Sequence, residues 1–194
     1  MLFRSCKGVV VDSAGGFAEA IELKLSDPDK DLEGAEKLLA EAIPKHSVKA
    51  VVIGNGAASR ETEAFVRAAI QKNAFDAMVI VANEAGASVY SGSRRAREEF
   101  PNLDNGARAL ISLARRLQDP LAELVKVDPR SIGVGQYQHD VDQKKLKQTL
   151  DKAVASAVNR VGVDLNSASR DLIRHVSGVG DKLASSLVAR RKQS

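Results

Sequence analysis

The sequence predicts an α/β domain that is followed by an all-α domain. Two near-continuous apolar segments, VKAVVIG at 48–54 and DAMVIVA at 76–82, are typical of buried strands, and a segment with helical spacing separates them. Strands of this kind pair in parallel through helical crossovers. After Glu84 the strand patterns stop and helical spacing dominates the rest of the chain.

The first half begins with a predicted β-hairpin. KGVVVD at 7–12 is rich in β-branched residues, SAGG supplies the turn, and FAEAIELKL at 17–25 alternates apolar and polar side chains. Residues 31–43 carry the apolar stripe of an amphipathic helix, and 59–71 is a second helical segment. The second helix lies between the two buried strands, where a parallel crossover requires it.

The second half is predicted to be helical. Five segments have helical spacing, at 104–117, 119–126, 142–160, 167–176 and 181–191. The stretch DPRSIGVGQYQHDV at 128–141 is an irregular loop between two of them. We therefore expect two domains, 1–126 and 127–194.

Composition indicates a globular protein with a basic second half. Residues 1–103 carry 13 Lys and Arg against 15 Asp and Glu, whereas residues 104–194 carry 16 against 10. This excess favours a polyanionic partner, although a solvated helical surface would also explain it. No apolar run approaches the ~20 residues that cross a membrane, so no membrane partner is expected. Cys6 is the only cysteine, which favours a cytoplasmic protein without a disulfide.

The stretch HVSGVGDKLASSLVARR at 175–191 contains two glycines one residue apart. A dinucleotide fingerprint needs a third glycine where Leu183 stands, and it follows a strand rather than a helix. The Gly-Lys-Ser/Thr of a P-loop is absent as well. We therefore expect no nucleotide cofactor and no small-molecule substrate.

A tight hairpin of two helices explains the same stretch better. Apolar faces flank a four-residue connection, in which Val179 would pack between the helices, and Asn166 or Ser167 can cap the first helix. Gly178 and Gly180 allow unusual backbone angles and a close approach of a ligand. Amides at the start of the second helix attract anions, and Lys182 stands beside them. Arg190 and Arg191 follow at the far end of the helix.

This stretch resembles the helix-hairpin-helix motif. DLNSASRDLIRHVSGVGDKLASSLVARR is similar to the competence-protein type, which grips a nucleic-acid backbone without reading bases. The resemblance implies that Gly178, Val179, Gly180, Lys182, Arg190 and Arg191 contact nucleic acid. A structural hairpin that serves only as a scaffold or a protein contact is the alternative.

Three longer stretches resemble the Tex family of bacterial transcription accessory proteins. They are VIGNGAASRETEAF at 52–65, NEAGASVYS at 83–91 and ARRLQDPLAELVKVDPRSIGVGQYQHDV at 114–141. The resemblance implies a YqgF-like domain of ribonuclease H fold at 1–126 and a partial helix-hairpin-helix domain at 127–194. The family's C-terminal S1 domain is absent from the sequence.

The resemblance also implies an incomplete sheet. In the family, a strand that ends in Asp-Pro-Gly precedes the residues matching Phe3 and Arg4, and it lies between the hairpin and the strand at 48–53. Without it, the sheet has a gap with unpaired backbone groups on both sides. We expect the hairpin either to slide toward that strand or to be loosely held.

Acidic residues of the first domain raise the question of a nuclease. By resemblance, Glu84 and Asp104 match acidic positions of YqgF-type domains, whereas Asn55 stands where some relatives carry a carboxylate. The resemblance implies that the central carboxylate of such a site is the Asp of the missing Asp-Pro-Gly strand. Two carboxylates without this Asp make a poor two-metal site. Structural roles are favoured instead, with Glu84 as a charge at a helix start and Asp104 as an N-cap. Cys6, His46, His139 and His175 lack the paired spacing of zinc ligands.

These observations predict sequence-nonspecific, non-enzymatic nucleic-acid binding in transcription, with RNA or DNA as the partner and the transcription machinery as a second candidate partner. We expect no catalytic residue, no metal and no cofactor. The loop side chains Gln136, Tyr137, Gln138 and His139 are expected to pin the loop rather than catalyse a reaction. Two alternatives remain open, a metal-dependent nuclease or resolvase of ribonuclease H type and a protein-interaction scaffold.

Overall fold

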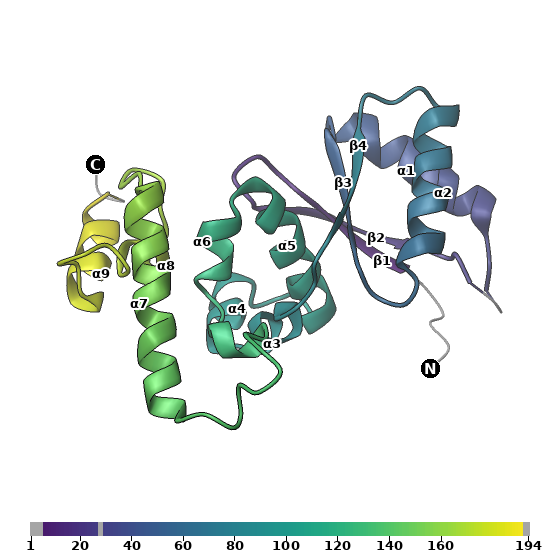
Figure 1. Ribbon diagram of the computed structural model, residues 1–194. Coiled ribbons are helices and arrows are strands. Elements are labelled where there is room, and N and C mark those ends of the chain that lie inside the picture. Colours follow the sequence, from purple (N-terminus) through teal and green to yellow (C-terminus); the bar gives the residue numbers. More distant parts are fainter. Residues whose placement is uncertain (1–5, 27–28, 192–194) are drawn as a thin grey trace. The chain divides into compact units, whose positions relative to one another are not determined.

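The computed structural model describes residues 6–26 and 29–191 of the chain, which divides into two compact units, Met1–Gln118 and Asp119–Ser194. The first unit contains four strands and five helices among its described residues, and the second contains helices only (Figure 1). The predicted order of an α/β part followed by an all-α part is confirmed. Phe3 and Arg4, which were matched to the family, lie outside the described residues.

The strands form two separate pairs. Strand β1 (Cys6–Val11) pairs antiparallel with β2 (Phe17–Leu23), and β3 (Ala50–Gly54) pairs in parallel with β4 (Met78–Ala82). Asp12 shapes the hairpin turn, because its Oδ1 accepts hydrogen bonds from the amides of Ala14 and Gly16 at 2.9 and 2.7 Å.

The two pairs are not hydrogen-bonded to each other within the described part of the chain. This arrangement agrees with the expected gap in the sheet. The hairpin has not moved across to pair with β3, so β1 and β3 each keep an edge without a neighbouring described strand. Such edges leave backbone donors and acceptors without a strand partner.

Helices α1 (Leu32–Lys45) and α2 (Ser59–Lys72) build the main core of this unit. Asp31 caps α1, because its side chain accepts a hydrogen bond from the amide of Gly34 at 2.8 Å. The buried residues come from both helices, β2 and β3, and they are Leu23, Ala35, Leu39, Ile43, Ile53, Val66 and Ala69. The core therefore connects the two strand pairs through the helices that cover them.

Three more helices complete the first unit: α3 (Ala87–Ser91), α4 (Arg94–Glu99) and α5 (Asn105–Gln118). Helix α5 packs on both β1 and β3. Its Arg115 donates to the carbonyl of Gly15 in the hairpin turn at 2.7 Å, and Gln118 donates to the carbonyl of Asp12 at 2.8 Å. Side chains of α5 thus hold the hairpin in place, whereas no strand pairing connects the hairpin to β3.

The second unit consists of α6 (Pro120–Leu124), the short 3₁₀ helix η1 (Pro129–Ser131), α7 (Gln143–Val161), α8 (Arg170–Ile173) and α9 (Asp181–Arg191). Its boundary lies at Gln118, ahead of the expected boundary at 126. The physical reason is that α6 packs on α8, and Val125 is buried in the core of the second unit.

That core is small and apolar. Val158 of α7, Ile173 of α8 and Ala184 of α9 are completely buried, and Val125, Ala168 and Leu172 complete the buried set. Helix α8 is shorter than the predicted segment 167–176. It begins after Ser169, whose side chain caps it by accepting from the amide of Leu172 at 3.3 Å, so the expected cap at Asn166 or Ser167 is wrong.

Candidate nucleic-acid interface

The glycine pair lies in a tight turn between α8 and α9. The amide of Val179 donates to the carbonyl of Val176 at 2.9 Å, and the amide of Ala184 donates to the carbonyl of Gly180 at 3.0 Å, so Gly180 lies immediately before α9 and accepts its first helical hydrogen bond. Val179 is half-buried against the core of the second unit. The turn is thus anchored by one apolar side chain, as predicted, while its backbone faces outward.

The two glycines serve different purposes. Gly178 has a φ of +81°, a left-handed conformation that favours glycine. The φ of Gly180 is outside that region, and a Cβ added there would have no heavy atom within 4 Å. Neither the backbone conformation nor the packing of the described chain requires a glycine at position 180. The absence of a side chain there leaves the backbone open to a ligand.

Asn159 of α7 fixes the start of this turn. Its Nδ2 donates to the carbonyl of His175 at 3.1 Å, and its Oδ1 accepts from the amide of Ser177 at 2.9 Å. Both bonds satisfy backbone groups immediately before Gly178. The long helix α7 therefore acts as a support for the hairpin, a role that the sequence analysis did not identify.

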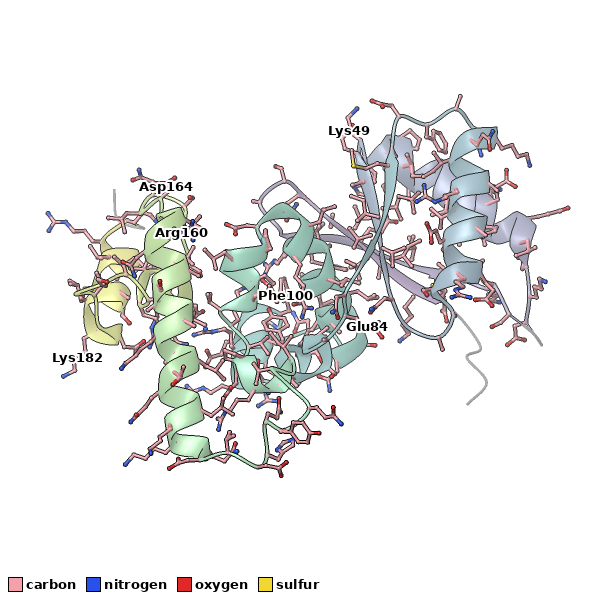
Figure 2. All side chains as sticks on the ribbon, viewed as in Figure 1. Lys49, Glu84, Phe100, Arg160, Asp164 and Lys182 are labelled. Atoms are coloured by element: carbon pink, nitrogen blue, oxygen red, sulfur yellow. The ribbon has the colours of Figure 1, made fainter. Side chains whose placement is uncertain are left out.

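The charged residues of the hairpin fall into two groups. Lys182 is exposed in the first turn of α9, and its side chain projects away from the helices (Figure 2). Asp181, its neighbour, forms an ion pair with Arg170 of α8, which offsets the negative charge beside the start of the helix. Lys182 is the predicted site residue that is best placed to meet an anion.

The side chain of Arg191 is fixed by hydrogen bonds to backbone carbonyls. Its Nη1 donates to the carbonyls of Leu165 and Ala168, both at 2.9 Å, which ties the end of α9 to the segment before α8. Arg190 lies beside it at the exposed end of α9. The structure thus brings Gly178, Val179, Gly180 and Lys182 together in one turn, and it places both arginines at the opposite end of the helix.

His175 precedes the hairpin turn and is partly buried. Burial lowers the pKa of its imidazole, and the charge of Arg174 lowers it further. The lowered pKa favours a neutral ring at pH 7. Its backbone carbonyl, rather than its ring, makes the contact to Asn159.

The two acidic positions of the first unit have structural contacts. Asp104 caps α5, because its Oδ1 accepts from the amide of Ala107 at 2.7 Å. Its Oδ2 pairs with Lys7 at 3.1 Å. The Ala107 amide is the main cause of the lowered pKa of Asp104, and Lys7 is the second cause. The Asp104 side chain thus occupies the N-cap position that the sequence analysis assigned to it.

Glu84 follows β4, and its amide donates to Oδ1 of Asn55 at 3.2 Å. Its carboxylate lies over the backbone of Gly54 and Gly56, where added Cβ atoms would come within 2.6 and 2.9 Å of its oxygens. Side chains at these two positions would therefore displace Glu84. Among the residues that the structure describes, no group of three or more His, Cys, Asp or Glu side chains is arranged to hold a metal ion.

The side chains of the loop at 128–141 differ in whether they hold the loop in place. Gln138 organises the loop, since its Oε1 accepts from the amide of Val134 at 2.9 Å and its Nε2 donates to the carbonyl of Arg130 at 3.2 Å. Tyr137 is 69% exposed, and His139 lies 3.5 Å from Gln138. Gln138 therefore pins the loop as expected, whereas the exposed Tyr137 does not.

No helix in the described part of the chain is both long and apolar enough to span a bilayer.

Comparison with known proteins identifies close relatives. Protein tex of Bordetella pertussis is 48% identical over 190 residues, and the Transcriptional accessory protein Tex of Neisseria gonorrhoeae is 46% identical over 189 residues. Both matches cover 97% of this chain and 24% of the relative. S1 RNA-binding domain-containing protein 1 of Homo sapiens is 50% identical over 147 residues, which are 74% of this chain and 15% of that protein. The chain thus spans about a quarter or less of the length of these relatives.

Two family models match the chain in two separate regions. The helix-hairpin-helix motif matches residues 158–194, which contain α8, the glycine turn and α9. The Tex protein YqgF-like domain matches residues 2–118, which is the first compact unit without its first residue. These matches, together with relatives that align over nearly the whole chain, show that the chain belongs to the Tex family.

Proposed function

We propose that this chain binds the backbone of nucleic acids without regard to base sequence, and that the turn Gly178–Lys182 is the contact. Gly180 carries this proposal, because nothing in the described fold requires a glycine there and its backbone is open to a ligand. A phosphate can approach such a backbone closely, and the positive end of the α9 dipole favours its charge.

The distribution of charge supports the proposal. The second unit, residues 119–194, carries 13 Lys and Arg against 9 Asp and Glu, whereas residues 1–118 carry 16 of each sign. All of the net charge of +4 therefore belongs to the unit that contains the hairpin. The name of the human relative, an S1 RNA-binding domain-containing protein, fits a nucleic-acid partner, and the Neisseria name fits a role in transcription.

Replacing Gly180 with alanine tests the proposal. The fold should tolerate the methyl group, with a cost below about 1 kcal/mol from the poorer helix cap. A methyl group between the backbone and a phosphate should weaken binding to RNA and DNA about tenfold or more, measured by fluorescence anisotropy. Gly135 is the matched control, since an added Cβ there also meets open space, so Gly135→Ala should leave affinity unchanged. Equal affinity for all three proteins would refute the role of the turn.

Lys182→Glu is the second variant of the same test. A phosphate contact carries no base information, so affinity should fall to a similar degree for unrelated sequences. The slope of log K against log salt should decrease by about 1. An unchanged slope together with capture of a protein ligand at the same turn would instead favour the interaction-scaffold alternative.

We further propose that binding occurs without cleavage. Asp104 is engaged as a helix cap and by Lys7, and no metal-holding cluster occurs among the described residues. Labelled RNA, duplex DNA and four-way junctions should therefore remain intact with Mg²⁺ or Mn²⁺. Metal-dependent turnover that is lost in Glu84→Gln would overturn this part of the proposal and favour a nuclease.

A further inference from the structure

Helix α7 presents a second basic surface beside the hairpin. Lys145 and Lys152 are seven residues apart, and Asn159 follows after another seven. Seven residues of α-helix turn through about 700°, or 20° less than two full turns, so the three side chains lie nearly in one line along the helix. We call Lys145, Lys152 and Asn159 the α7 stripe.

Among the described residues, no acidic residue lies between the members of the α7 stripe on their face of the helix, and at its start Asp142 is engaged as the helix cap by the amides of Lys144 and Lys145. The side chains that lie between its members on the same face are uncharged, namely Gln148, Thr149, Ala155 and Ser156. Asp151, the one acidic residue within α7, is rotated about 100° from Lys152 and pairs with Lys147 at 2.7 Å. Lys145 and Lys152 are both exposed, and no ion pair neutralises either of them within the described chain.

Asn159 connects the α7 stripe to the hairpin. Its two hydrogen bonds to residues 175 and 177 show that this face of α7 looks toward the glycine turn. At 1.5 Å of rise per residue, Lys152 stands about 10 Å and Lys145 about 21 Å from Asn159 along the helix axis. The lysines therefore extend away from the turn in a line, at a spacing larger than one phosphate-to-phosphate step.

We propose that the α7 stripe is a second contact for the nucleic-acid backbone, so that one ligand touches the glycine turn and then Lys152 and Lys145. This inference rests on the proposed function of the turn. The ligand it fits is a nucleic acid that continues for about 20 Å beyond the hairpin, or about six base pairs at 3.4 Å each. Each lysine meets a phosphate as a point charge, which gives affinity and length dependence without sequence preference.

The test compares ligand lengths in the full chain. Wild-type protein should bind a 20-base-pair duplex at least about 30-fold more tightly than a DNA hairpin with a three-base-pair stem, because a stem of about 10 Å cannot contact the turn and both lysines at once. In the double variant Lys145→Glu/Lys152→Glu, this ratio of affinities should fall to about threefold. That remaining ratio is expected because a longer duplex offers the turn more equivalent places to bind. The salt slope on the long duplex should decrease by about 2.

Lys30→Glu/Lys37→Glu is the matched control. Both lysines are exposed in the first unit, and the double variant changes the net charge by the same amount. It should keep the length ratio of the wild type, and so separates a local contact from a general charge effect. Lys145→Gln/Lys152→Gln removes the charges without reversing them, and circular dichroism should show that it keeps the helical content of the wild type while its ratio still falls.

The outcomes separate this inference from the function on which it rests. If the wild type binds both ligands and the ratio survives in the Lys145/Lys152 variants, the α7 stripe is not a contact, although the turn still is. A control that loses the ratio as well would also overturn the inference. If the wild type binds neither duplex nor single strands, the proposed function fails and the inference fails with it.

Discussion

Ile173→Ala is expected to destabilise the second unit by about 2–5 kcal/mol. Ile173 is completely buried, and it packs in the small cluster that joins α7, α8 and α9. Truncation removes apolar contacts and leaves a cavity that the short helix α8 cannot easily close. A unit of 76 residues has a stability of roughly 4–11 kcal/mol at the usual value per residue, so the loss is a large part of the total.

Amide hydrogen exchange within α7 measures this effect in the second unit alone. Exchange at 150–158 should become at least about 30-fold faster, since each 1.4 kcal/mol corresponds to a factor of ten. Val161→Ala is the control, because Val161 is 74% exposed at the end of α7 and its truncation should change exchange less than twofold. Nucleic-acid affinity should fall in Ile173→Ala and not in the control. Similar exchange in both variants would mean that this cluster does not hold the hairpin.

The regular elements could be predicted because their patterns depend on local sequence. After Lys49, the run AVVIG at 50–54 has no polar residue that would suit an exposed strand face, and it forms β3. The SAGG turn forms as expected, because Asp12 and Gly15 supply the cap and the positive φ that a tight turn needs. The hairpin glycines were recognised for a similar reason, since few alternatives fit four residues between two apolar helical faces.

The parts that could not be predicted depend on tertiary contacts. Helices α3 and α4 contain five and six residues, too few to show a helical period, and α4 is fixed by a cap at Ser93. Helix α8 begins later than predicted because Ser169, rather than an earlier residue, accepts the amide of Leu172. Asn159 could not be identified as a site residue, because its function depends on backbone groups 16 and 18 residues away.

Arg115→Ala is expected to free the hairpin β1–β2 from the rest of the first unit. The guanidinium of Arg115 donates to the Gly15 carbonyl at 2.7 Å, pairs with Glu99 at 2.6 Å and lies 4.8 Å from the ring of Phe100. Gly15 is required for this contact, since a Cβ there would lie 2.9 Å from Arg115 Nε. Loss of a hydrogen bond to a charged group costs about 1.5–3 kcal/mol, and the cation–π contact adds about 0.5–2 kcal/mol.

The effect should concentrate in the hairpin because the edge of β1 opposite β2 has no described strand beside it. Hydrogen exchange at 8–23 should already be faster than at 107–117 in the wild type. In Arg115→Ala it should accelerate by a further 10-fold or more, while α5 itself changes less. Arg60→Ala is the control, since Arg60 is exposed and its side chain makes no hydrogen bond or ion pair within the described residues. Strong and equal protection of the hairpin and α5 in both proteins would contradict this account, and it would mean that the hairpin is held by strand pairing rather than by α5.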